Sequence, residues 1–176
     1  FDGLGTWRLQ PVADGRGGDS LRAQGLVAQN FDRQVIGGTT IMVAQRAYFM
    51  MAAFRAGDVV TNLHLIVTAQ GVTMSLSKMG LYTLAGARLA LSADQTTGWE
   101  TTGLKVVPLT APYTIPASGA YYVAIVANGG TLPTLRRGDS GGATAIPGAS
   151  IPYGAQSSQS DLPASATIAE TNGIAY

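Results

Sequence analysis

The 176-residue sequence has no cysteine, a single histidine and few charged side chains. Without cysteine the chain can form neither a disulfide nor a thiolate metal site, and its redox compartment cannot be read from the sequence. The absence favours assembly inside a cell, because secreted domains often use disulfides. One histidine, His64, is too few for a metal centre built from several imidazoles. The sequence therefore shows no complete catalytic or metal-binding constellation.

Charge is both scarce and balanced. Charged residues make up 12% of the chain and hydrophobic residues 46%, with 11 basic and 10 acidic side chains. No basic stripe is available to bind nucleic acid or an anionic membrane, and no apolar run is long enough to span a bilayer. We therefore expect no nucleic-acid partner, no membrane insertion and no cofactor. The composition favours a packed β protein, or one whose surfaces are covered by partner subunits.

The fold is indicated most clearly between residues 57 and 128. Short runs of alternating apolar and polar residues follow one another there, each closed by Gly, Pro, Asn or Asp. This pattern is typical of an all-β, antiparallel β-sandwich. A change in the apolar phase predicts a β-bulge at Lys78. We expect strands within 61–69, 72–77, 87–92, 105–109 and 120–127, a turn from 111 to 119, and late strands near 144–146 and 167–168.

The alternation also predicts which side chains share a face. In 61–69, Leu63, Leu65 and Val67 lie on one face, and His64 lies on the other with Asn62, Ile66 and Thr68. We interpret His64 as a surface or interface histidine.

Two segments, 48–54 and 120–127, are apolar on both faces. Such a strand is either central in the sandwich or covered from outside, although a short buried helix competes for 48–54. Because a lone sandwich exposes its outer faces, we expect contact between subunits to bury these strands.

The N-terminal 38 residues differ in pattern from the rest of the chain. Residues 1–38 are rich in turn residues and lack a clean period, so we divide the chain into an N-terminal arm or linker (1–38) and a sandwich domain (39–176). The arm either packs on its own domain or reaches a neighbouring chain, and the sequence leaves both open.

The polar loop 92–103 contains the candidate ligand-binding residues, Trp99, Asp94 and Glu100. An exposed Trp99 would offer an apolar platform for the face of a sugar. The alternative is that Trp99 folds back over the end of the sandwich. Asp94 and Glu100 could chelate Ca²⁺ together with backbone carbonyls, but a solvated loop is favoured and we expect no resident metal.

The string GDSGG at 138–142 is similar to the nucleophile turn of trypsin-like serine proteases. In that family the turn exposes a serine, here Ser140, and aims backbone N–H groups at an oxyanion. His64 and Asp94 precede Ser140 in the order of the triad. However, His64 lies within an alternating strand instead of the family's T-A-A-H context, and the His64–Ser140 spacing is short for two barrels. The sequence therefore favours a simple turn and a protein that is not an enzyme.

The segment from about Arg55 to Asn128 resembles jelly-roll-like β-sandwich domains in tail, fibre and other surface proteins of tailed bacteriophages. The matching features, in order, are AGDVVT at 56–61, MGLY at 79–82, RLA at 88–90, the Trp99 loop, VPLT at 107–110, the proline-rich turn at 112–119 and AYYVA at 120–124. The resemblance implies a homotrimer on the virion surface, assembled in the host cytoplasm. It also implies contact with other virion proteins and with host carbohydrate or protein.

Three functions follow as hypotheses. The first is a non-enzymatic phage virion surface protein, acting as a receptor-binding, tail-fibre or decoration module. The second is a carbohydrate-binding module of a larger secreted enzyme, and the third is the trypsin-like protease.

Overall fold

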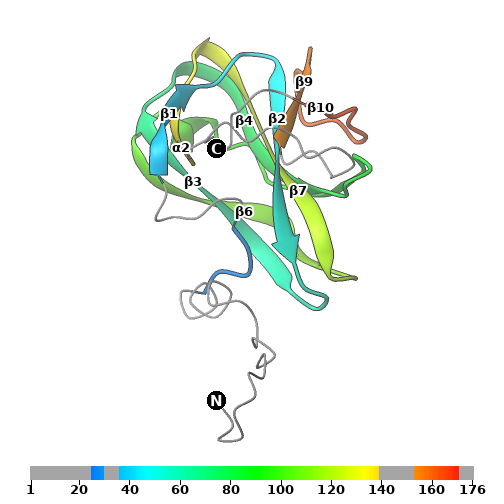
Figure 1. Cartoon of the computed structure of the whole chain (residues 1–176). Helices are drawn as coiled ribbons and strands as arrows, with labels where there is room; N and C mark the ends of the chain where they lie inside the picture. Colours follow the sequence, from blue (N-terminus) through cyan, green and yellow to red (C-terminus); the bar gives the residue numbers. More distant parts are fainter. Residues whose placement is uncertain (1–24, 30–35, 139–152, 171–176) are drawn as a thin grey trace, which may run out of the picture.

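The computed structural model describes residues 25–29, 36–138 and 153–170. Almost all of its regular structure is β-strand (Figure 1). The elements are β1 (Ile36–Ile41), β2 (Arg46–Phe54), β3 (Val59–Ala69), β4 (Val72–Tyr82), β5 (Arg88–Leu91), α2 (Thr96–Trp99), β6 (Gly103–Thr114), β7 (Gly119–Thr131), β8 (Thr134–Gly138), β9 (Tyr153–Ser157) and β10 (Ala169–Glu170).

The strands form two antiparallel sheets that pack face to face. One sheet has the order β1-β8-β3-β6 and the other the order β10-β9-β2-β7-β4-β5. Figure 1 shows β1 and β3 on one side of the molecule and β2, β7 and β9 on the other. The predicted antiparallel β-sandwich is therefore confirmed, and segment 48–54 is a strand, not a helix.

The main core fills the space between the sheets. It includes Tyr48 and Leu81 from the six-stranded sheet, Leu135 from the four-stranded sheet, and Trp99 from α2, all buried. Phe54 and Tyr121 meet edge to face with ring centroids 5.8 Å apart, an arrangement that aromatic rings favour. Of the described residues before β1, Val27 and Ala28 pack against this core. The division of the chain at residue 38 stays a prediction.

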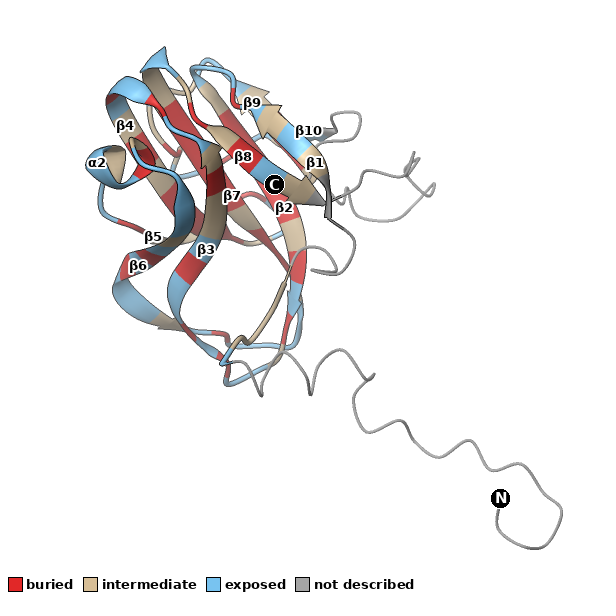
Figure 2. Cartoon of the chain, turned by 90° about the vertical axis from the view of Figure 1, so that its left-hand side faces the viewer, coloured by how far each residue is buried: buried red, intermediate tan, exposed pale blue. Residues whose placement is uncertain are grey.

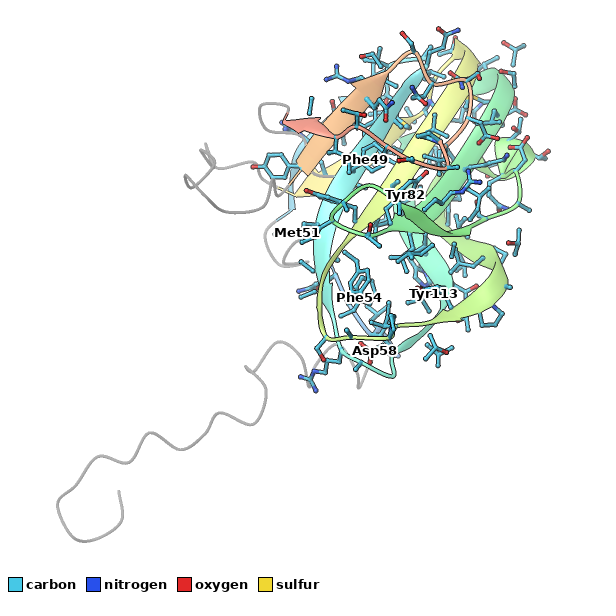
Figure 3. The ribbon with its side chains drawn as sticks, turned by 90° about the vertical axis from the view of Figure 1, so that its right-hand side faces the viewer. Phe49, Met51, Phe54, Asp58, Tyr82 and Tyr113 are labelled. Carbon is cyan, nitrogen blue, oxygen red and sulfur yellow. The ribbon has the colours of Figure 1, made fainter. Side chains whose placement is uncertain are left out.

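A second apolar cluster covers the outer face of the six-stranded sheet. Phe49 of β2 lies edge to face with Tyr82 of β4 at 5.2 Å and with Tyr122 of β7 at 6.3 Å. Leu162 and Ala166 also belong to this cluster. Both belong to residues 158–168, named here the C-terminal strap, which runs over Phe49 and Tyr82 in Figure 3.

Hydrogen bonds hold the C-terminal strap on β4 and β5. The Tyr82 hydroxyl donates to the carbonyl of Pro163 at 2.7 Å, and Lys78 pairs with Asp161 at 2.6 Å. Backbone bonds join Arg88 to Ala164 at 3.0 Å and Ala166 to Gly86 at 2.8 Å.

Strands β2 and β7 are central in the six-stranded sheet, and the C-terminal strap of the same chain covers their outer face. The expectation that subunit contact buries them is wrong, because the strap already does so.

The element boundaries differ from the prediction in several places. β6 continues through Pro108 and Pro112 to Thr114, where a turn was expected. The bulge in β4 lies between Met74 and Leu76, three residues before Lys78. Strands β8 and β9 were not predicted, and β10 begins just after the predicted 167–168. The predicted strand at 144–146 lies outside the described residues.

Candidate functional site

The loop after β5 does not present Trp99 to solvent. The side chain is 0% exposed and belongs to the main core. Its backbone N–H donates to the carbonyl of Gln95 at 3.1 Å, and its carbonyl accepts from the N–H of Gly71 at 3.0 Å. The exposed sugar platform is therefore wrong, because the indole is needed to fill the core. The alternative orientation, in which Trp99 folds back over the sandwich, is confirmed.

Asp94 and Glu100 attach the same loop to β4. One carboxylate oxygen of Asp94 accepts from the backbone N–H of Ser77 at 2.9 Å and from the hydroxyl of Thr96 at 2.7 Å. Glu100 accepts from the backbone N–H of Met74 at 2.9 Å. Both carboxylates therefore have structural partners on the protein itself. Among the described residues, no group of three or more acidic or histidine side chains is placed to hold a metal ion.

Hydrogen bonding also sets the charge state of Asp94. Partial burial raises the pKa of this carboxyl. Three hydrogen bonds from Thr96 and Ser77, with the positive charge of Lys78, together lower the pKa below its usual value. Asp94 is consequently ionised at neutral pH and remains a hydrogen-bond acceptor for β4.

The residues of the protease hypothesis are only partly described. His64 is exposed on β3 of the four-stranded sheet, opposite Val106 of β6. Asp94 is bonded to β4 of the other sheet. Ser140 and the rest of 138–142 after Gly138 lie outside the described residues. The protease hypothesis stays a prediction.

The outer surface of β3 and β6 combines exposed aliphatic side chains with neutral polar ones, and its residues carry no formal charge. Leu104 is 60% exposed and Val106 53%, and they pair across the strands with Ile66 and His64. We name this surface the β3–β6 face and define it by Thr61, Asn62, His64, Ile66, Leu104, Val106, Pro108 and Thr110. In Figure 2 exposed and buried stretches alternate along both strands, as expected for strands with one face in the core.

Only one residue of β3 and β6 is formally charged, and it does not contribute to this face. Lys105 pairs across the strands with Leu65, and Leu65 packs against the core. The ammonium group of Lys105 donates to the Thr101 hydroxyl at 2.6 Å and to the Thr102 carbonyl at 3.2 Å. The β3–β6 face therefore presents exposed aliphatic side chains without a charged side chain from either strand, and it is the clearest candidate interaction surface of the described chain.

Comparison with known proteins does not extend this picture. No protein-family model matches the sequence, and no curated protein matches it at a significant level. The resemblance to phage surface domains therefore stays a prediction. In the described part of the chain, no helix has the length and apolar character needed to cross a membrane.

Proposed function

We propose that this chain is a non-enzymatic β-sandwich module of a tailed-phage virion surface that assembles with copies of itself through the β3–β6 face. The observation that carries the proposal is the exposure of Leu104 and Val106 on the β3–β6 face, whose own residues carry no formal charge. Exposed apolar area stabilises a contact by about 25 cal/mol per Å² when it is removed from water. Contiguous apolar area of this kind commonly marks an interaction site.

A second copy is the partner that this surface fits best. In a contact between identical subunits, any charged residue on the face would approach the same charge on its neighbour. The β3–β6 face has none among its own residues, and the exposed Arg136 lies on β8, which β3 separates from β6. A contact centred on β6, the edge strand farther from Arg136, therefore meets its own copy without like-charge repulsion. The sequence resemblance favours a trimer among the possible assemblies.

The other large apolar surface does not compete for this role. Phe49, Tyr82 and Tyr122 are buried beneath the C-terminal strap within one chain. Assembly thus leaves the strap side and the ends of the sandwich free. Those surfaces would face outward on the virion and meet the host.

A single introduced thiol tests the contact, because the chain has no cysteine. In Val106→Cys the thiol should be protected from a maleimide at concentrations where subunits associate and become reactive on dilution. Leu84→Cys is the matched control, since Leu84 is 40% exposed in the turn between β4 and β5. It should react quickly at every concentration. Equal rates for the two variants at all concentrations would overturn the proposed assembly face.

The proposed location has its own test. An antibody raised against the purified chain should label intact particles of the phage that encodes it, visible by immunogold electron microscopy. Labelling of disrupted particles alone would contradict a position on the virion surface.

A further inference from the structure

A shallow depression lies where four segments of the chain meet. They are the turn between β1 and β2, the start of β4, the end of β7 and the C-terminal strap. Its volume is about 580 Å³, within the range of small-ligand sites. We name it the polar depression, and the side chains that matter here are Gln45, Thr73, Ser75, Leu76, Asn128 and Ser160.

Asn128 fixes the walls of the polar depression. Its amide oxygen accepts a hydrogen bond from the backbone N–H of Gln45. Its amide nitrogen donates to the carbonyl of Ser160 at 3.0 Å. The backbone of Gln159 in turn donates to the carbonyl of Gln45 at 2.8 Å. The β1–β2 turn and the strap are thus joined through the Asn128 amide, and these hydrogen bonds shape the depression in the absence of a ligand.

Unusual backbone geometry gathers at the same place. Of the three described non-glycine residues with positive φ, two line the depression: Gln45 at 56° and Thr73 at 51°. Positive φ is especially unfavourable for a β-branched residue such as threonine. The bulge between Met74 and Leu76 lies here too, and bulges often re-aim a side chain beside a binding site. Strained backbone of this kind is concentrated at functional sites.

The chemistry of the lining selects a neutral ligand. No acidic, basic or histidine side chain contributes to it. The adjacent Asp161 is paired with Lys78. The side chains of Gln45, Ser75 and Ser160 make no hydrogen bond to any other described residue, so amide and hydroxyl groups that both donate and accept face the opening. Leu76 and Ala44 add apolar surface between them.

We infer that the polar depression binds a neutral saccharide unit. Hydroxyl groups of a sugar match donors and acceptors of both kinds, and its carbon face matches the apolar part of the lining. A charged ligand would find no side chain of opposite charge in the lining. Because the depression is open, a dissociation constant in the millimolar range is expected for one sugar unit, about 4 kcal/mol of binding free energy. This inference deepens the host-contact part of the proposed function and rests on it for its biological role only.

Titration of the ¹⁵N-labelled chain with neutral monosaccharides tests the inference by amide chemical shifts. Glucose, galactose and N-acetylglucosamine would each be added to about 50 mM, well above the expected dissociation constant. At least one should shift amides confined to residues 44–45, 73–76, 128–130 and 160. Galacturonate should bind at least threefold more weakly than galactose if galactose is the ligand. Absence of shifts for all three sugars, or shifts centred elsewhere, would overturn the inference.

Two variants separate binding from folding. Gln45→Gly removes the backbone strain of a positive φ at this position and keeps the backbone N–H that donates to Asn128. The melting temperature of this variant should therefore be no lower than that of the wild type. It should bind the sugar at least fivefold more weakly, because the side-chain amide is gone. Thr97→Ala, which removes an exposed hydroxyl on α2, is the matched control and should bind as the wild type does. Unchanged affinity in Gln45→Gly would overturn the inference. The mass of the chain in solution tests the proposed assembly separately. An oligomer that binds no sugar would refute only the sugar site, and a monomer that binds sugar would refute only the proposed assembly.

Discussion

Replacing Leu162 with alanine should lower the free energy of unfolding by about 3 kcal/mol. Leu162 is 2% exposed, and its side chain packs against Gly80 of β4 within the second apolar cluster. The substitution removes three buried carbons, worth about 2.4 kcal/mol at about 0.8 kcal/mol each. The cavity left against β4 adds to this loss, because the hydrogen bonds of the strap limit its collapse.

Urea unfolding measured by tryptophan fluorescence, to which buried Trp99 contributes together with Trp7, is a direct assay. For a chain of this size the slope is about 2 kcal/mol per molar urea, so the midpoint should fall by about 1.5 M. Both proteins are compared at one concentration, because assembly adds to apparent stability. Leu84→Ala is the control, and its effect should stay within about 0.5 kcal/mol because Leu84 is 40% exposed. A loss of less than about 1 kcal/mol in Leu162→Ala would refute the packed strap.

Three further perturbations follow from the same contacts. Gly86→Ala should destabilise the fold by more than about 2 kcal/mol in the same urea assay, because φ is +87° and an added Cβ would overlap the carbonyl of Ala166. Asp94→Ala should cost about 1 kcal/mol at pH 7 by losing its accepted hydrogen bonds. The wild type should also lose more stability than this variant as the pH falls below 3.8, since the pKa of Asp94 is lowered in the fold. Burial raises the pKa of Tyr82 from 10.0 to about 12, so the folded state keeps a proton that the unfolded chain loses. Stability should decline between about pH 10 and 12, and Tyr82→Phe should flatten that decline in a pH series of thermal melts. Equal acid profiles for wild type and Asp94→Ala, or equal alkaline profiles for wild type and Tyr82→Phe, would contradict these assignments.

The strand pattern was readable from sequence where burial follows simple alternation. Leu63 and Val67 point into the core and His64 points out, as their spacing predicts. The prediction was wrong at Pro112, which was placed in a turn. β6 is an edge strand of the four-stranded sheet, and an edge strand tolerates proline because not every N–H must join a ladder.

The position of Trp99 could not be read in the same way. It stands alone in a polar loop, and periodicity gives no orientation to an isolated aromatic side chain. Its burial depends on contacts with β4 made by Asp94 and Glu100, which bond to the backbone of Ser77 and Met74. Those contacts are tertiary, so both orientations stayed open at the level of sequence.

The C-terminal strap escaped prediction for a related reason. Leu162 and Ala166 are isolated apolar residues among serines, alanines and one proline, without a strand-like or helix-like period. Their partners are distant in sequence: Tyr82 bonds to Pro163 across 81 residues. Segments 48–54 and 120–127 are apolar on both faces, and this pattern did predict that the outer face of their sheet is covered. The sequence could not show that this cover belongs to the same chain.

The mass of the unmodified chain in solution tests the proposed assembly most directly. Light scattering behind a sizing column should give a multiple of 18.1 kDa, with a trimer favoured, and Leu104→Lys should reduce it to a single subunit. Leu84→Lys, at the exposed turn between β4 and β5, should leave the mass unchanged. A wild-type mass of 18.1 kDa at every concentration would contradict assembly through the β3–β6 face.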